Sequence, residues 1–140
     1  MKKVFRRIFR QNHLFLWGPV VVCYGLISFV SSLPSSSFHF SLGRFDKAVH
    51  FLEFGLFGSL TARALFWERL YHHVRKNGWI IGGGIISVLA MIDEVHQMFV
   101  PGRTSEVMDW LADVGGAAFG MIVCRAIYHR SVDDHSFSKI

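Results

Sequence analysis

The feature that most constrains this chain is a 33-residue stretch, from Gln11 to Gly43, that contains no Lys, Arg, Asp or Glu. A helix of about 20 apolar residues is long enough to cross the hydrocarbon core of a bilayer. Of the 140 residues, 51% are hydrophobic and 18% are charged, whereas an average soluble protein has about 25% charged residues. The sequence therefore predicts an integral membrane protein rather than a soluble domain.

Four apolar segments follow one another along the chain, at about 14–33, 46–67, 78–99 and 106–128. Each has the length of a transmembrane helix. The first follows a basic tail, as in a signal peptide, but its apolar run exceeds the usual length of about 7–15 residues, which favours an uncleaved helix. We expect an all-α bundle of four transmembrane helices over residues 14–128, with cytoplasmic tails at 1–13 and 129–140.

The Lys and Arg residues are divided unevenly between the two ends of these helices. Twelve lie in or beside the N-terminal tail, the connection between the second and third helices, and the C-terminal segment. The other three, Arg44, Lys47 and Arg103, lie at the opposite end. Because short cytoplasmic loops are rich in Lys and Arg, we predict a multi-pass protein of the cell membrane with both termini in the cytoplasm.

The formal net charge of +5 raises the question of a nucleic-acid partner. The basic residues lie at helix ends and in short connections, and do not form an amphipathic face interleaved with aromatic side chains. Such a face is the usual footprint of nucleic-acid binding. The distribution therefore argues against a nucleic acid and leaves the lipid bilayer as the expected surrounding.

The acidic residues gather at the end of the bundle that we predict to face outward. Orientation does not require this, because Asp and Glu contribute little to topology. An ionisable group at membrane depth costs about 2.5–3.5 kcal/mol or more, so such groups are paired, face water or serve function. Helical spacing places them on three faces, which carry Asp46, His50 and Glu53 with Lys47 beside them; Asp93 and Gln97 with Glu94 on the flank; and Asp109 with Asp113.

Small residues continue the acidic face of the fourth segment. Gly116 and Gly120 are four residues apart, and the second segment has Gly55 and Ser59 at the same spacing. This pattern lets membrane helices approach closely. We therefore expect the acids on the same face to point into the bundle and to converge beneath its outer surface.

A tight turn is predicted where Pro101, Gly102 and Arg103 connect the third and fourth segments. The turn would hold Arg103 over the acidic face. A guanidinium in that position can pair with Asp109, or it can bind a phosphate or carboxylate through two parallel hydrogen bonds. The sequence leaves both alternatives open.

These motifs together resemble the VanZ-like family. The resemblance covers about residues 14–124 and is carried, in order, by Asp46-Lys47-x-x-His50-Phe51, Asp93-Glu94-x-x-Gln97, Pro101-Gly102-Arg103, and Asp109 with Gly115, Gly116 and Gly120. One departure is Asp113, where the family pattern often has Asn. The resemblance implies a small membrane protein associated with glycopeptide resistance of the teicoplanin type, without a settled biochemical mechanism.

The polar residues allow three interpretations. They form a structural network of ion pairs with Lys47 and Arg103, they perform acid–base chemistry or bind a substrate, or they hold a cation. Since no HExxH or equivalent motif occurs, we expect no metal and no cofactor, and keep a divalent cation as the least favoured alternative. The catalytic candidates are His50, Glu94 and Asp109, and the candidate binding residues are Asp46, Lys47, Glu53, Asp93, Gln97, Arg103 and Asp113.

Two classes of function fit these residues. In the first, the outward-facing cluster binds or modifies a lipid-linked or anionic head group of the cell envelope. In the second, the protein is a non-catalytic membrane scaffold whose charged cluster holds its helices together. The sequence does not decide whether the protein is an enzyme, and it does not give the oligomeric state.

Overall fold

The structure is a computed structural model and describes residues 13–37, 45–67 and 72–137. Its elements are α2 (His13–Ser31), the short 3₁₀ helix η1 (Ser35–Ser37), α3 (Asp46–Trp67), α4 (His72–Gln97) and α5 (Val107–Phe137). Every regular element in the described part of the chain is helical. The predicted all-α fold with four long helices is thus confirmed.

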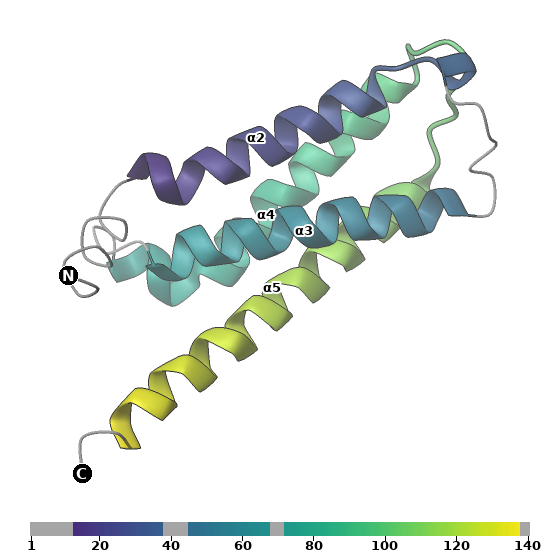
Figure 1. The fold of residues 1–140 in the computed structure, drawn as a ribbon. Coiled ribbons are helices and arrows are strands. Elements are labelled where there is room, and N and C mark those ends of the chain that lie inside the picture. The colour runs from purple at the N-terminus through teal and green to yellow at the C-terminus, as the bar shows by residue number, and fades with distance from the viewer. Residues whose placement is uncertain (1–12, 38–44, 68–71, 138–140) are drawn as a thin grey trace.

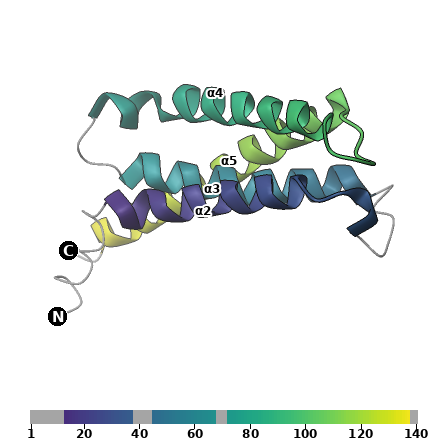
Figure 2. The ribbon, with the colours of Figure 1, turned by 90° about the horizontal axis from the view of Figure 1, so that it is seen from above.

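The four long helices alternate in direction, so that α3 and α5 run parallel to each other (Figures 1 and 2). The ends of α2 and α4 and the beginnings of α3 and α5 lie together at one end of the bundle (Figure 1). α3 contacts each of the other three helices, and its interface with α5 is the largest in the bundle. The motif-bearing ends of the helices therefore meet at one end, which we call the polar end.

Three helical segments are long and apolar enough to cross a membrane, namely His13–Ser31, Asn77–Gln97 and Val107–Ile127. α3 has 22 residues, which is also long enough, but its apolar run is interrupted by His50, Glu53 and Arg63. Because α3 packs against all its neighbours, polar groups on it can face protein instead of lipid. Large apolar side chains are exposed on α2, α4 and α5, as expected of surfaces that contact lipid tails.

Two helices extend beyond the segments that hydropathy marks. α4 begins at His72 instead of about Gly78, and α5 continues to Phe137 instead of ending near Tyr128. The added turns are rich in polar and charged residues. An apolar run marks only the part of a helix that can lie in lipid. The backbone hydrogen bonds of the same helix continue into the polar residues on either side.

The α3–α5 interface is built on glycine. A Cβ atom added at Gly116 would overlap the carbonyl oxygen of Phe51, and one added at Gly120 would overlap the carbonyl oxygen of Gly55. Ser59 Oγ also donates a hydrogen bond to Gly120 O at 3.1 Å. The small-residue stripes predicted for these two helices therefore do face each other, and the two backbones come into direct contact.

α2 is joined to the bundle differently, through hydrogen bonds to carbonyl groups beside a proline. Pro19 lies inside α2, and because proline has no N–H, the carbonyl group of Phe15 lacks its usual donor four residues later. The Arg63 side chain on α3 supplies donors instead, from Nη2 to Phe15 O and to Leu16 O, each at 3.2 Å. Arg63 of α3 thus replaces the hydrogen-bond donor that α2 lacks at Pro19, and it links the two helices.

Candidate functional site

The loop between α4 and α5 has the tight turn that its sequence predicts. Gly102 has a φ of 77°, and the N–H of Arg103 donates to Val100 O at 3.1 Å. Proline followed by a glycine with positive φ defines a type II turn. Ser35 holds this turn against the end of α2, with its N–H donating to Pro101 O at 3.4 Å and its hydroxyl donating to Gly102 O.

The turn positions Arg103 at the C-terminal end of α2. Its Nε donates to Leu33 O at 3.4 Å, and its Nη2 donates to Val30 O at 3.2 Å. These carbonyl groups belong to the last turn of α2 and to the residues just beyond it, where a helix lacks internal donors and favours positive charge. Arg103 therefore caps α2 from the α4–α5 loop, a role that the sequence did not reveal.

Lys47, near the beginning of α3, bridges to the beginning of α5. Its ammonium group lies 2.7 Å from Glu106 Oε2 and 3.0 Å from Asp109 Oδ1. The side chains of Lys47 and Glu106 are about half exposed, whereas that of Asp109 is buried. Lys47 thus supplies a cationic partner for Asp109, in agreement with the network interpretation, and it forms the outer rim of the cluster.

His50 lies one turn deeper in α3 and contacts two other helices. Its Nδ1 is 3.0 Å from Asp113 Oδ1 on α5 and 4.0 Å from Glu94 Oε1 on α4. All three side chains are buried. Glu94 Oε2 accepts hydrogen bonds from Ser105 Oγ at 3.0 Å and from the Glu106 backbone N–H at 3.1 Å.

Two buried carboxylate oxygens of this inner group have no hydrogen-bond partner among the described residues, namely Glu94 Oε1 and Asp113 Oδ2. Nearly all buried polar atoms in folded proteins have a partner. Leaving a buried acceptor without one costs about 1–3 kcal/mol, and more when it is charged. The inner group is therefore not a complete network of internal hydrogen bonds.

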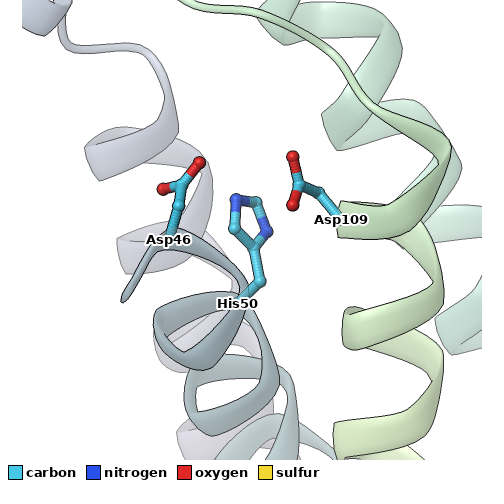
Figure 3. A group of neighbouring side chains, drawn as sticks. All are labelled: Asp46, His50 and Asp109. Carbon is cyan, nitrogen blue, oxygen red and sulfur yellow. The ribbon is translucent and has the colours of Figure 1, made fainter. Parts of the chain in front are cut away.

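Figure 3 shows His50 between two more carboxylates, with Asp46 on its own helix and Asp109 on α5. One ligand atom from each of these three residues lies within 4.8 Å of the other two. Asp46 is half-buried, and His50 and Asp109 are buried. The imidazole of His50 is accordingly the central group of the polar end, because it adjoins Asp46 and Asp109 as well as Glu94 and Asp113.

Asp93 and Gln97 form a second buried pair at the end of α4. Asp93 Oδ2 accepts a hydrogen bond from Gln97 Nε2 at 3.0 Å and another from Ser31 Oγ on α2, also at 3.0 Å. The bond from Ser31 joins the last turns of α2 and α4. Glu53 is only half-buried, and its carboxylate interacts electrostatically with Asp93 of α4 and with Arg103 of the α4–α5 loop.

The structure brings the residues selected from the sequence to one end of the bundle, but it divides all except Glu53 and Arg103 into three groups. Lys47 and Asp109 belong to the outer rim, the imidazole of His50 and its carboxylates form the centre, and Asp93 with Gln97 faces α2. Sequence analysis did not select Ser31, Ser105 or Glu106 as site residues. Their signal was position alone, because each lies at or next to a helix terminus at the polar end.

The inner group has two chemical capacities. A histidine that is hydrogen-bonded to a carboxylate is the usual arrangement of a general base, and the partner is Asp113 at 3.0 Å rather than Glu94. One imidazole nitrogen and two carboxylate oxygens are also a ligand set suited to a divalent cation. The backbone contacts between α3 and α5 hold His50 and Asp113 in register for either use.

Fold and site together define a small helical membrane protein with a polar site at one end of its bundle. A model of the VanZ/LLP1 family matches residues 4–128. The chain belongs to this family, as its motifs indicated. No curated protein and no solved structure matches the chain significantly.

Proposed function

We propose that this VanZ-family protein crosses the cell membrane four times and binds a lipid-linked or anionic head group of the cell envelope at its polar end. α3 is the fourth span in this proposal, since it has the length to cross and contacts each of the other three helices. Both termini lie in the cytoplasm, as the Lys and Arg distribution favours. The polar end then faces outward.

The observation that supports the head-group proposal is the position of the polar cluster relative to the ends of the apolar spans. The three apolar spans end or begin at Ser31, Gln97 and Val107, all at the polar end. Asp113 lies six residues into α5, which corresponds to a depth of about 9 Å along the helix. The cluster therefore extends from the membrane interface, where head groups lie, about two turns into the bundle.

Two cationic side chains at this level are suited to a phosphate or carboxylate. Lys47 is exposed at the rim, and Arg103 is half-buried in the loop above the cluster. A guanidinium has five N–H donors, so Arg103 can donate to the end of α2 and also present parallel donors to such a group. The proposed link to teicoplanin-type resistance comes from the family alone.

The scaffold alternative is supported by one observation, namely that side-chain hydrogen bonds at the polar end join all four helices. α3 is bonded to α5 through Lys47, α2 to α4 through Ser31, and the α4–α5 loop to α2 through Arg103. If these bonds only maintain the fold, weakening them reduces stability and activity together. The head-group and scaffold functions therefore predict different effects of a conservative substitution of Arg103 on stability and activity.

The test is Arg103→Lys, with Arg125→Lys as a matched control at the far side of the bundle. A lysine can still donate to the end of α2, but it cannot form two parallel hydrogen bonds with a head group. Loss of one charge-assisted hydrogen bond of about 1.5–3 kcal/mol weakens binding by about 10- to 100-fold. We expect co-purified lipid, identified by mass spectrometry, and teicoplanin resistance to fall while the melting temperature stays unchanged.

Arg125→Lys should change none of these quantities, because Arg125 lies over the ring of Trp79, away from the cluster. Lipid recovery should also fall in His50→Ala. If Arg103→Lys lowers the melting temperature and resistance in parallel and leaves the co-purified lipids unchanged, the head-group proposal is wrong and the scaffold function is favoured.

A further inference from the structure

Three buried side chains, each from a different helix, meet below the rim of the polar end. They are His50 of α3, Glu94 of α4 and Asp113 of α5, and one ligand atom from each lies within 4.8 Å of the other two. The side chains of His50 and Glu94 are each 7% exposed, and that of Asp113 is fully buried. An imidazole nitrogen and two carboxylate oxygens thus face a common point inside the bundle.

A second observation points to a ligand at this point. Glu94 Oε1 and Asp113 Oδ2 are buried without a hydrogen-bond partner among the described residues. Each is the second oxygen of a carboxylate whose first oxygen is already bonded, Glu94 Oε2 to Ser105 and Asp113 Oδ1 to His50. Two buried carboxylate oxygens therefore have lone pairs that no hydrogen-bond donor among the described residues uses, and a cation could accept them.

The hydrogen bonds around Glu94 resemble the outer shell of a metal site. Ser105 Oγ and the N–H of Glu106 both donate to Oε2, and they leave Oε1 directed toward His50 at 4.0 Å. In metalloproteins, ligating carboxylates and histidines are oriented by such second partners. The α4–α5 loop therefore holds one oxygen of Glu94 so that the other remains available.

The charges of the inner group are consistent with a divalent ion. The ammonium group of Lys47 pairs with Glu106 and Asp109 at the rim, above the inner group. When both are ionised, Glu94 and Asp113 carry two negative charges, and a protonated His50 balances only one of them. A divalent cation balances both and leaves His50 neutral, which is the form in which histidine binds metal.

We propose that His50, Glu94 and Asp113 bind one divalent transition-metal ion of the Mn²⁺ or Zn²⁺ class. Mixed imidazole and carboxylate ligands suit these ions, whereas Ca²⁺ prefers oxygen alone. With three protein ligands the ion retains at least one open position for water or another ligand. The inference rests on the geometry of the inner group and does not depend on head-group binding.

The test uses the full-length chain in detergent, with any affinity tag removed and the protein treated with a chelator. Mn²⁺ is titrated, and the free ion is followed by its electron paramagnetic resonance signal, with Zn²⁺ added as a competitor. We expect one Mn²⁺ per chain. Glu94→Gln and Asp113→Asn should each weaken binding by at least about 10-fold, since changes even in the outer shell of a metal site do so.

Glu106→Gln is the matched control, because it removes a carboxylate at the exposed rim and keeps the backbone N–H that contacts Glu94. Its Mn²⁺ affinity should equal that of the wild type. In case the buried variants do not fold, electron spin echo spectra of the wild type provide a second measurement. Bound Mn²⁺ should show coupling to one imidazole nitrogen, and this coupling should be lost in His50→Ala.

The absence of saturable Mn²⁺ binding, equal affinity in all three carboxylate variants, or the absence of nitrogen coupling would each overturn the metal site. These outcomes are separate from the head-group proposal. Mn²⁺ is titrated without added lipid, and lipid recovery is measured without added metal. A failure of one proposal is therefore not mistaken for a failure of the other.

Discussion

Glycines on two helices of this protein have different surroundings. In α5, a Cβ at Gly116 or Gly120 would overlap the backbone of α3, whereas in α2 a Cβ at Gly18 or Gly25 meets nothing within 4 Å. The residue type is the same, but only the α5 pair forms a stripe that faces a partner with small residues. A glycine in a membrane helix therefore indicates close packing only when its spacing is matched on a neighbouring helix.

The attachment of α5 to the bundle also differs from that of α2. α5 is joined to α3 by contact between backbones, which sets the register that places Lys47 beside Asp109 and His50 beside Asp113. α2 is joined to its neighbours by side-chain hydrogen bonds that occur in its first turn, near its middle and at its last residue. We infer that the α3–α5 pair sets the register of the site, that α4 adds Glu94 to it, and that α2 covers one side of it.

The largest effect expected from this comparison is that of Gly116→Leu. The new side chain would have to displace the backbone of α3 at Phe51, so we expect a loss of more than about 3 kcal/mol, above the usual cost of overpacking. The measurement is the free energy of unfolding in mixed micelles. Separation of the helices should also break the contact between His50 and Asp113.

The matched control for this change is Gly25→Leu in α2, where the added side chain meets open space. We expect a change below about 0.5 kcal/mol. If the two leucine variants lose equal stability, then the α3–α5 backbone contact is not what holds the bundle, and the comparison fails.

The second effect concerns the attachment of α2 at its proline. Arg63→Leu removes both donors to the carbonyl groups of Phe15 and Leu16, and we expect a loss of about 1–2 kcal/mol. Pro19→Ala restores a backbone N–H that can donate to Phe15 O. In the Pro19→Ala background, Arg63→Leu should therefore cost less, and a double-mutant cycle measures the difference. Independent, additive losses would show that Arg63 does not compensate for the proline.

The sequence predicted the helices well where hydrophobicity and helix formation coincide. α3 was expected at residues 46–67 and is found at Asp46–Trp67. The start of α4 and the end of α5 were placed too far inward, because the polar residues there belong to the helix but not to its apolar run. The number of spans and the orientation of the termini stay predictions.

Helical spacing also grouped the site residues correctly within each helix, but it could not pair them between helices. Asp109 and Asp113 share a face of α5, yet the first contacts Lys47 and the second contacts His50. These partners depend on how far α5 is shifted along α3, which follows from backbone contacts at Gly116 and Gly120. The spacing of residues within one helix carries no information on that shift.

The donors to main-chain carbonyl groups were the least predictable part of the site. Arg103 was expected to pair with Asp109 or to bind a ligand, and the structure shows that it donates to Val30 O and Leu33 O. Every helix has unsatisfied carbonyl groups at its C-terminus. Which side chain reaches them depends on the path of a loop, and the sequence of Pro101 and Gly102 indicates a turn without giving its direction.

The smallest effect is expected in the middle of α2, at Tyr24. Its hydroxyl donates to Leu89 O on α4 at 3.4 Å, which is long for such a bond, and its ring stacks on Phe57 of α3 with centroids 5.5 Å apart. Tyr24→Phe removes the hydroxyl and keeps the ring. Hydrogen bonds between membrane helices contribute about 0.6 kcal/mol on average, so we expect a loss of that size or less in the same unfolding assay. Tyr24→Ala, which also removes the ring, should cost several times more. If Tyr24→Phe destabilises the protein as much as Arg63→Leu, the attachment of α2 is spread evenly along the helix instead of being concentrated at its ends.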